Sequence, residues 1–589
     1  MNNGKPESLL LSEVCRIING TLYGEDKRIK KVSFSITDKI EEGDLFFAFY
    51  IPNVVDTYSN IPLAISENVA AIVTDKYIEN FPCIVVQEPM EALLKLTEWY
   101  RERMNIKVVA VTGSIGKTTT KLMISSVLKD AFQMEENRGN NNSAHNVAQG
   151  ILGLQNTTEV YLQEKSMTYM HLSSLACKPT IAVVTNIGHS HARIYGTREN
   201  IFIEKMKIVD GMDKNSVVIL NIDDDLLCGY KDDMGRKIIT YSLENKEADF
   251  RATDIEKDDM GYHFNICYQG KKQKARINCQ GRHNVINAVA AYIVGLQLKM
   301  DKEDILRGLE EYRPTSIRQN IFTVGETTVY ADCFNASPVS MKYALDTLEE
   351  YDLSAGTKVA VLGDMTGYGD YTKEFHAEIG RYLNHKKIDR VIFYGEEMSA
   401  ALEVVNNSNI KVDHILWRSE LMKILKDEVV NTKSVVLFKA SSAKKLAGVI
   451  DELFATEFTK IKGKKNYRMQ NVEMKALRKY FSKNSVNTVA VYGLGVGERV
   501  LLETLEKCGV SVNYAIDRKA KYLPEGIYPV PVKYFGQELE KVDMIIVTLL
   551  GYEKELVIRL QNEAKTDKVL YFNELYENAM EGCGKISES

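Results

Sequence analysis

Residues 108–128, VVAVTGSIGKTTTKLMISSVL, decide the fold class of this chain. They combine an apolar strand, a turn with two glycines and the start of an amphipathic helix, which is the order found in a phosphate-binding loop. Gly113 and Gly116 permit positive φ angles and a close approach of the backbone to phosphate oxygens. Lys117 adds a positive charge at the start of the helix, and Thr118 offers a hydroxyl to Mg²⁺. The stretch therefore predicts an α/β domain that binds the phosphates of ATP.

The loop departs from the strict GxxxxGK[ST] pattern, because a valine occupies the first glycine position, so the shorter TGxxGKT form carries the prediction. The alternative interpretation is a glycine-containing turn that packs a helix against a strand and carries a lysine by chance. The strand before the turn, the helix after it and the three threonines favour the phosphate site. Ser114 and Thr119 belong to the same predicted site.

The composition is typical of a globular protein with several domains. The chain has 589 residues, which at roughly 100–200 residues per domain predicts about three to five domains. Hydrophobic residues make up 45% of the chain and charged residues 26%, as in ordinary globular proteins. The net charge of -5, with no long run of one sign, argues against a nucleic-acid partner.

Cysteine usage and the N-terminal sequence point to the cytoplasm. The nine cysteines are an odd number and include no CxxC pair, which favours reduced thiols over disulfides or a zinc site. The N-terminus lacks the basic and apolar regions of a signal peptide, and no apolar run approaches the roughly 20 residues that cross a bilayer. We therefore expect a cytoplasmic protein without a transmembrane segment.

Strand and helix patterns divide the chain into four α/β domains. We expect an N-terminal domain over residues 1–100, and a central ATP-binding domain over residues 101–315 with strands such as IAVVTN and SVVILN. A third domain over residues 316–465 contains KVAVLGD, RVIFYG and SVVLFKA, which predict another parallel sheet. A polar stretch then leads to a fourth domain over residues 480–589, which begins with the strand NTVAVYG.

The phosphate loop and several later motifs occur in the order typical of one enzyme family. TGSIGKTTTK, NIGHSHARIYGTRENIFIEKMKI, GRHNVINAVAA, ADCFNASPVSM and VLFKASSAKK follow one another between residues 8 and 455. In this order they resemble the Mur ligase family, which builds the stem peptide of peptidoglycan, and within it the MurF branch. The resemblance implies a multidomain α/β architecture with an N-terminal substrate domain, a central P-loop ATPase domain and a Rossmann-like third domain.

Two of the family segments carry the predicted metal ligands. The resemblance identifies His191 as a metal-binding histidine and Lys205, fourteen residues later, as a lysine that is carbamoylated. A carbamate turns the lysine into an anionic oxygen ligand, which suits a hard cation such as Mg²⁺. VYLQEKS resembles the segment that supplies a glutamate to the metal, here Glu164, alongside Thr118. The alternatives are a surface histidine, a solvated helix lysine and an exposed glutamate.

The resemblance also implies residues that hold the nucleotide. Asn284 and Asn287 in GRHNVINAVAA would reach the adenine, although an asparagine pair at helical spacing also suits a helix cap. Arg318 resembles the family arginine that reaches the phosphates from the third domain, although Ile317 replaces the glycine that usually precedes it. Asp332 in ADCFNASPVSM would contact the ribose.

Substrate contacts are expected between the central and third domains. Asn335 and Ser337 in ADCFNASPVSM, and Lys439 and Ser441 in VLFKASSAKK, resemble family residues that touch the substrates. The N-terminal domain departs further from the family. The turn EEGDLFFAF is kept, but Lys39 replaces the arginine of the family's T/S-D-S-R motif and the later D-G-H stretch is missing. This sequence therefore matches the family motifs that contact the glycan substrate less well than the family motifs that bind ATP.

The last domain resembles the first half of a Rossmann unit, and the Mur ligase resemblance does not extend to it. The segment that starts with NTVAVYGLGVGERVLL has Gly493, Gly495 and Gly497 in its turn. Asp517 lies about where a ribose-binding acid would be, whereas Glu498 takes the usual position of the third glycine. The alternative is an ordinary turn that packs a helix against a strand, and the motif does not decide between the two.

The chemistry implied by the resemblance is an ATP-dependent ligation. A substrate carboxylate attacks the γ-phosphate of ATP, and an amine then displaces phosphate from the acyl phosphate to form an amide. Lys117, His191 and Lys205 are the predicted catalytic residues. The expected partners are small molecules, a nucleotide-sugar peptide or another glycan carboxylate and an amino acid or dipeptide amine, and we expect a monomer. Three functions stay open: a MurF-type cell-wall ligase, a related ligase for another nucleotide- or lipid-linked glycan, and a nucleotide-binding scaffold with little catalysis.

Overall fold

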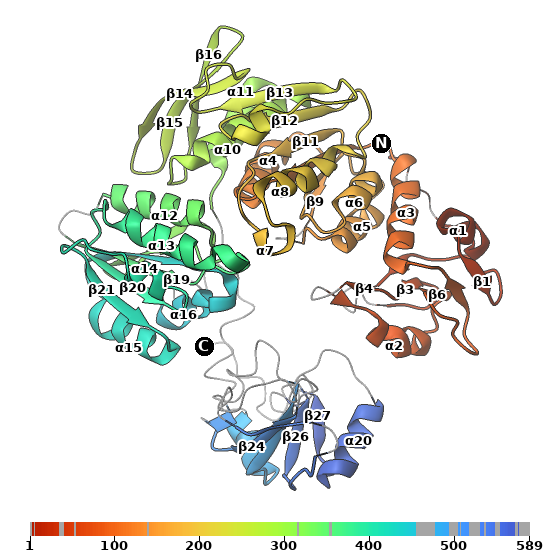
Figure 1. Ribbon diagram of the computed structural model, residues 1–589. Coiled ribbons are helices and arrows are strands. Elements are labelled where there is room, and N and C mark those ends of the chain that lie inside the picture. The colour runs from red at the N-terminus through yellow and green to blue at the C-terminus, as the bar shows by residue number, and fades with distance from the viewer. Residues whose placement is uncertain are drawn as a thin grey trace, which may run out of the picture. The chain divides into compact units, whose positions relative to one another are not determined.

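The structure is a computed structural model, in which the chain forms two compact units, residues 1–461 and 462–589. It describes all residues except 1–2, 5, 7, 35–39, 52–54, 138–140, 315–316, 353–355, 455–476, 494–504, 507, 517–529, 535–536, 548–553, 572–574 and 576–589. The first unit contains three large sheets and a two-stranded hairpin, and the second unit contains one sheet (Figure 1). The finer domain boundaries expected from the sequence stay a prediction.

The first sheet has the strand order β1-β7-β6-β3-β2, and all its neighbours except β1 and β7 run parallel. Its strands are β1 (Thr21–Tyr23), β2 (Val32–Ser33), β3 (Leu45–Phe47), β6 (Ala71–Thr74) and β7 (Cys83–Val85). The strands β4 (Tyr50–Ile51) and β5 (Val55–Asp56) form the separate hairpin. The helices are α1 (Leu11–Ile18), α2 (Ile61–Ser66) and α3 (Pro89–Glu102), with the 3₁₀ turn η2 at Tyr58–Asn60.

The second sheet has nine strands in the order β16-β15-β14-β13-β12-β11-β8-β10-β9, and it positions the phosphate loop. Strand β8 (Lys107–Thr112) lies between β11 and β10 and is parallel to both. Every residue of β8 after Lys107 is buried, which explains its uninterrupted apolar sequence. The other strands are β9 (Met134–Glu136), β10 (Val160–Glu164), β11 (Ile181–Val184), β12 (Val217–Asn221), β13 (Lys237–Ser242), β14 (Phe250–Lys257), β15 (Tyr262–Tyr268) and β16 (Lys271–Ile277).

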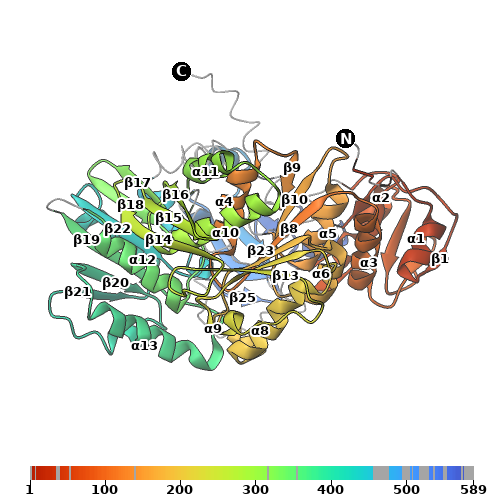
Figure 2. The same cartoon turned by 90° about the horizontal axis from the view of Figure 1, so that it is seen from above.

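Helices α4, α10 and α11 pack together against this sheet (Figure 2). The apolar side chains of α4 and α10 join those of β8, β10 and β11 in one core, so the helix that follows the phosphate loop is held rigidly. The helices of this region are α4 (Lys117–Leu128), α5 (Ala144–Gly153), α6 (Met170–Cys177), α7 (Ala192–Tyr195), α8 (Arg198–Met206), α9 (Asp225–Cys228), α10 (His283–Gln297) and α11 (Lys302–Glu311), with η3 at Lys207–Val209. The strands predicted around the phosphate loop, at IAVVTN and at SVVILN are confirmed as β8, β11 and β12.

The third sheet has the order β17-β18-β22-β19-β20-β21, and all its pairs are parallel except the edge pair β17 and β18. Its strands are β17 (Asn320–Val324), β18 (Thr327–Ala331), β19 (Thr357–Gly363), β20 (Arg390–Tyr394), β21 (Lys411–Ile415) and β22 (Ser434–Lys439). The helices are α12 (Pro338–Glu350), α13 (Thr372–Leu383), α14 (Ser399–Leu402), α15 (Arg418–Glu428) and α16 (Leu446–Leu453), with η4 at Gly369–Tyr371 and η5 at Ser442–Lys444. The predicted parallel layer is confirmed, with an antiparallel edge strand added.

The second unit has a parallel five-stranded sheet in the order β25-β24-β23-β26-β27. Its strands are β23 (Thr488–Tyr492), β24 (Ser511–Ile516), β25 (Val532–Lys533), β26 (Met544–Val547) and β27 (Val569–Tyr571), and its helices include α20 (Lys554–Ala564). Gly493 ends β23 with a φ of +93°. Gly495, Gly497, Glu498 and Asp517 lie outside the described residues. Over the part of the chain that the structure describes, no helix is long and apolar enough to cross a membrane.

Candidate active site

The loop between β8 and α4 has the backbone that a phosphate site requires. Gly113 has a φ of +146° and Gly116 a φ of +83°, in the region that favours glycine. A Cβ at Gly113 would lie 1.9 Å from Oγ1 of Thr185, and a Cβ at Gly116 would lie 2.9 Å from Oδ1 of Asn287. Gly116 is the N-cap of α4 and no side chain caps this helix. The positive end of the helix dipole therefore faces the loop without a side-chain acceptor, as an anion site needs.

Two lysines meet at the carbonyl oxygen of Gly113. The Nζ of Lys117 and the Nζ of Lys205, which comes from α8, each donate a hydrogen bond to this oxygen at 2.9 Å. Lys205 is 2% exposed, so the alternative of a solvated helix lysine is wrong. Burial, together with the positive charge of Lys117, holds the pKa of Lys205 well below its usual range. Burial also lowers the pKa of Lys117.

Glu164 is the last residue of β10 and reaches the phosphate loop from the neighbouring strand. Its Oε2 accepts a hydrogen bond from Oγ1 of Thr118 at 2.6 Å, and its Oε1 accepts one from Nδ2 of Asn142 at 2.8 Å. Glu164 is 1% exposed, so the alternative of an exposed glutamate is wrong. Both carboxylate oxygens are thus oriented within the site, beside the threonine that was predicted to bind Mg²⁺.

His191 lies directly before α7 and has a φ of +71°. Burial and the positive charges of Lys205 and Lys117 lower the pKa of its imidazole to about 4, so the ring is neutral at pH 7. A neutral imidazole is the form that binds a metal ion. His191 lines the same cleft as Thr118, Glu164 and Lys205, and its side chain is exposed to solvent there.

This donor set fits a hard divalent cation. A hydroxyl and a carboxylate within 2.6 Å of each other face one cleft together with a neutral imidazole, and Mg²⁺ prefers a few such oxygen ligands together with phosphate oxygens. Among the described residues, no group of three or more His, Cys, Asp or Glu side chains is placed to hold a metal. A metal here would therefore also need a ligand of another kind, such as the Thr118 hydroxyl.

The opposite wall of the cleft follows strand β18 and includes the end of β22. The guanidinium of Arg318 lies 3.6 Å from the ring centroid of Phe334, a cation–π contact that holds it against the cleft. The Oδ2 of Asp332 lies 2.9 Å from Nζ of Lys439, and this amine also donates a hydrogen bond to the carbonyl of Asn335 at 2.6 Å. Asp332, the predicted ribose ligand, is thus paired with the predicted substrate-binding Lys439.

The two asparagines of GRHNVINAVAA belong to α10, and they do not cap it. The N-cap of α10 is Arg282, so the helix-cap interpretation is wrong. The Oδ1 of Asn287 accepts a hydrogen bond from Oγ1 of Thr120 at 3.1 Å, and its Nδ2 donates to Oδ1 of Asn284 at 3.2 Å. Asn284 in turn donates to Oε1 of Gln319 at 2.9 Å. The pair therefore links the phosphate-loop helix to the start of the third sheet.

One cleft of about 280 Å³ collects most of the predicted site residues. The predicted residues that line it are Ser114, Gly116, Lys117, Thr118, Thr119, Glu164, His191, Lys205, Asn287, Arg318, Asp332, Asn335, Ser337 and Lys439. Three predicted residues do not line it. Gly113 contributes the carbonyl that the two lysines share, and Asn284 is hydrogen-bonded to Asn287 and Gln319, which both line the cleft. The Oγ of Ser441 accepts a hydrogen bond from the backbone of Thr366 at 3.0 Å.

Comparison with known proteins identifies the family of the chain. The Mur ligase middle domain matches residues 111–295, and the Mur ligase, glutamate ligase domain matches residues 317–442. The chain is 30% identical over 461 residues to the UDP-N-acetylmuramoyl-tripeptide--D-alanyl-D-alanine ligase of Bacillus subtilis, which covers 75% of this chain and 98% of the relative. The chain belongs to the Mur ligase family.

Solved structures agree with this assignment. This Mur ligase matches MurF from Acinetobacter baumannii with 25% identity and a TM-score of 0.69, over 77% of this chain and 100% of that one. It matches the MurF ligase from Thermotoga maritima in complex with ADP with 25% identity and a TM-score of 0.64, over 73% of this chain and 98% of that one. The α/β multidomain Mur ligase fold is confirmed. The protein is a MurF-like, ATP-dependent, ADP-forming ligase of peptidoglycan precursor synthesis, and a scaffold without catalysis is not supported.

A larger cavity of about 620 Å³ adjoins the cleft of this Mur ligase. The two share Ile115, Gly116, His283, Asn287 and Tyr343. The ring of His283 stacks on Tyr343, with centroids 4.6 Å apart and planes 3° from parallel. Burial lowers the pKa of His283 to about 4, so the stacked ring is neutral at pH 7. The cavity thus adjoins the phosphate loop, and the stacked rings of His283 and Tyr343 form part of its wall.

Sequence reasoning missed several residues that the structure brings to this site. They are His283, Gln319, Phe334 and Tyr343. His283 and Phe334 lie inside motifs that were recognised, so a signal for them was present. Gln319 and Tyr343 lie outside the recognised motifs, and only the packing of α10 and α12 brings them into contact with the site.

Proposed function

We propose that this Mur ligase joins the terminal carboxylate of UDP-N-acetylmuramoyl-tripeptide to the amine of D-alanyl-D-alanine, in the cytoplasm and with ATP. The observation that carries the proposal is the single cleft in which the phosphate loop meets Glu164, His191 and Lys205. Further support comes from the relative named for this reaction, 98% of which is covered by the match.

ATP would bind across the two adjoining cavities. The phosphate loop and Lys117 would hold the β- and γ-phosphates in the smaller cleft, and Arg318 would contact the phosphates from the facing wall. The adenine would enter the larger cavity beside Asn287. Asp332, which lines the smaller cleft, would accept hydrogen bonds from the ribose hydroxyls. The geometry supports this arrangement because the two cavities share Gly116 of the loop.

Mg²⁺ would be held by Thr118, Glu164, His191 and a carbamoylated Lys205. When bound, the metal supplies Lewis-acid stabilisation to the transferring phosphoryl group. Carbamoylation needs a neutral amine, because the lone pair of Nζ attacks the carbon of CO₂ and a proton then leaves the nitrogen. Burial supports this step, since it holds the pKa of Lys205 well below its usual range and favours the uncharged form.

The proposed reaction proceeds in two displacements. A carboxylate oxygen of the first substrate forms a bond to the γ-phosphorus, and the bond from that phosphorus to ADP breaks. Lys117 and Arg318 offset the negative charge that develops on the phosphoryl oxygens. The nitrogen of the amine then attacks the acyl carbon, a proton leaves the nitrogen, and inorganic phosphate departs as the amide forms. Asn335, Ser337, Lys439 and Ser441 are the proposed substrate contacts.

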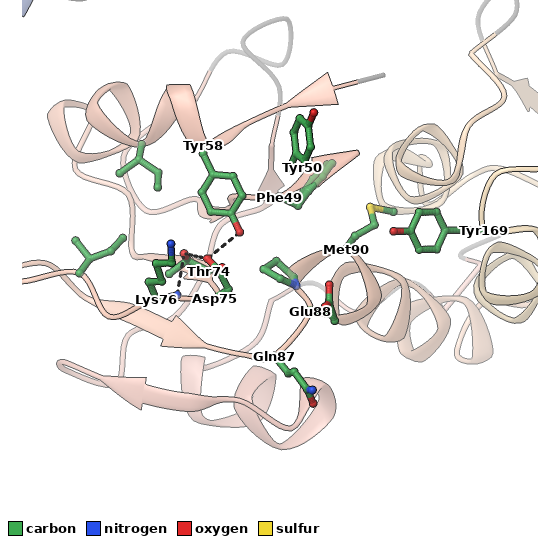
Figure 3. A pocket seen from close by; sticks show the side chains of 13 residues that line it. Phe49, Tyr50, Tyr58, Thr74, Asp75, Lys76, Gln87, Glu88, Met90 and Tyr169 are labelled. Atoms are coloured by element: carbon green, nitrogen blue, oxygen red, sulfur yellow. Dashed lines mark hydrogen bonds between the residues drawn. The ribbon is translucent and has the colours of Figure 1, made fainter. Parts of the chain in front are cut away.

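A pocket in the N-terminal sheet favours a second candidate, ligation to a different glycan. The pocket has a volume of about 420 Å³ and is lined by aromatic side chains that include Tyr50 and Tyr58. Figure 3 shows Tyr58 directed toward Asp75, and its hydroxyl donates a hydrogen bond to Oδ1 of that residue at 2.8 Å. Burial and the negative charges of Asp75 and Glu88 raise the pKa of Tyr58. Lys76 is the one cationic side chain among the described residues that line the pocket.

This charge balance suits a neutral, hydroxyl-rich sugar better than a diphosphate. Sugar rings stack on aromatic side chains, and carboxylates accept hydrogen bonds from their hydroxyls. A diphosphate would instead approach two carboxylates with only one lysine to offset the repulsion. If the substrate extends into this pocket, the acceptor would therefore be a glycan without a nucleotide diphosphate at that position.

The two candidates are separated by phosphate release from ATP and Mg²⁺ across a matrix of glycan carboxylates and amines. We expect release with UDP-N-acetylmuramoyl-tripeptide and D-alanyl-D-alanine together and not with either alone. Release only with another glycan would replace the first candidate by the second. An Asp75→Asn variant sharpens the comparison, because removal of the charge should lower KM for a nucleotide sugar and raise KM for a neutral sugar that donates to Asp75. Absence of release with every pair would contradict the proposed ligation.

A further inference from the structure

A buried lysine with no role in the proposed chemistry lies one helical turn beyond the phosphate loop. Lys121 of α4 is 1% exposed and lines neither of the two adjoining cavities. Its Nζ donates a hydrogen bond to the carbonyl of Asn137 at 2.7 Å, and Oε1 of Glu136 is 3.9 Å away. Burial of an ammonium group costs free energy unless the group is hydrogen-bonded or paired with a negative charge. Here the amine contacts both the last residue of β9 and the residue after it.

Asn137 connects this lysine to the strand that carries Glu164. The side-chain Oδ1 of Asn137 accepts a hydrogen bond from the backbone N–H of Glu164 at 2.8 Å. Its Nδ2 donates to the carbonyl of Asn141 at 3.0 Å, and its own backbone N–H donates to the carbonyl of Leu162 at 3.1 Å. One asparagine thus contacts both the backbone N–H of Glu164 and the carbonyl of Asn141.

A second asparagine contacts the carboxylate of Glu164 itself. Asn142 donates from Nδ2 to Oε1 of Glu164 at 2.8 Å, and its carbonyl accepts a hydrogen bond from the backbone of Ser166 at 2.8 Å. Thr118 donates to the other carboxylate oxygen at 2.6 Å. Glu164 is therefore held at its backbone by Asn137 and at its two carboxylate oxygens by Asn142 and Thr118.

We propose that Lys121 and Asn137 are positioning residues that set the orientation of Glu164 toward the Mg²⁺ of the nucleotide. This inference rests on the proposed function, in which Glu164 is a metal ligand. Groups that orient a metal ligand without touching the metal typically contribute about 10–100-fold to metal affinity. Because Lys121 does not line the cleft, it would act on Glu164 from outside the metal site, through its hydrogen bond to Asn137.

The test compares the affinity for ADP with excess Mg²⁺ and with EDTA, by calorimetry on the full chain. We expect the Lys121→Met variant to bind ADP in EDTA with an affinity within about twofold of that of the parent. The factor by which Mg²⁺ raises the affinity for ADP should be at least about tenfold smaller in the variant than in the parent. Lys165→Met is the matched control, because Lys165 is equally buried and follows Glu164 directly but donates to Ser173. We expect Lys165→Met to keep the full effect of Mg²⁺.

Two further variants make every outcome decisive. If Lys121→Met loses affinity equally in EDTA and in Mg²⁺, or keeps the full effect of Mg²⁺, the positioning role is wrong. Asn137→Ser replaces Lys121→Met in the comparison if the latter does not fold, with the same expected result. Glu164→Gln separates this inference from the proposed function. Loss of the Mg²⁺ effect in Glu164→Gln but not in Lys121→Met refutes only the positioning role, whereas no loss in Glu164→Gln refutes the metal role of Glu164.

Discussion

Replacement of Lys205 by methionine should greatly reduce the activity of the enzyme and change the stability of its fold only slightly. Lys205 is almost fully buried, and among the residues that the structure describes its amine makes one hydrogen bond, to the carbonyl of Gly113. Methionine keeps most of the apolar stem, so little packing is lost. The carbonyl of Gly113 still accepts a hydrogen bond from Lys117 at 2.9 Å and is not left unpaired.

The size of both effects follows from these contacts. One lost hydrogen bond costs about 0.5–1.5 kcal/mol, and relief from burying an amine acts in the opposite direction, so the free energy of unfolding should change by less than about 1.5 kcal/mol. Loss of a metal ligand should remove several kcal/mol of transition-state stabilisation, about 10²–10³-fold in turnover at roughly 1.4 kcal/mol per tenfold. Activity should therefore collapse in a protein that remains folded.

The assay pairs urea unfolding with phosphate release at saturating ATP, and Lys165→Met serves as the control because it also removes a buried lysine. The parent protein should lose activity when bicarbonate is removed and regain it on addition, and its intact mass should show one added CO₂. Lys205→Met should respond to neither treatment. Full turnover by a folded Lys205→Met, or a parent indifferent to bicarbonate, would refute the carbamate role.

Three further results are expected. Gly113→Ala should lower the free energy of unfolding by about 1–3 kcal/mol and abolish ADP binding in calorimetry, because a Cβ there meets Oγ1 of Thr185 at 1.9 Å on a backbone with a φ of +146°. Arg318→Met should weaken ADP binding about 10–100-fold, since a buried charge-assisted contact contributes about 1.5–3 kcal/mol; unchanged affinity would remove Arg318 from the nucleotide site. The pKa of His283 is lowered to about 4 by burial, so the unfolded chain binds more protons below about pH 6.5 and stability should fall as pH drops from there to about 4. Urea midpoints should show a weaker fall for His283→Phe, and an identical fall would contradict the shift.

The phosphate loop was predictable because its determinants are local. A buried strand, glycines at two positions with positive φ and a helix start are adjacent in sequence, and β8 and α4 form as expected. The recognised motif also supplied Lys205, which no local pattern distinguishes from a solvated helix lysine. Its burial arises from the packing of α8 against the loop, where it reaches the carbonyl of Gly113.

Contacts between elements that are far apart in the chain could not be predicted from the sequence. The helix-cap interpretation of Asn284 was wrong because α10 begins at His283, and the asparagine instead pairs with Gln319 across 35 residues. The ring stack of His283 and Tyr343 depends on how α12 meets α10. The N-terminal pocket gathers residues from 49 to 169, so its acidic character appears only once the strands are arranged. The remaining glycines of the last Rossmann-like motif lie outside the described residues, and their role stays a prediction.

The most direct test of the central claim follows a heavy-oxygen label placed in the substrate carboxylate. Transfer through an acyl phosphate forms a bond between a carboxylate oxygen and the γ-phosphorus, and the later attack of the amine leaves that oxygen on phosphate. With the substrate pair that supports turnover, mass spectrometry should find one labelled oxygen in each released phosphate, together with ADP. Unlabelled phosphate, or AMP with labelled oxygen, would contradict the account.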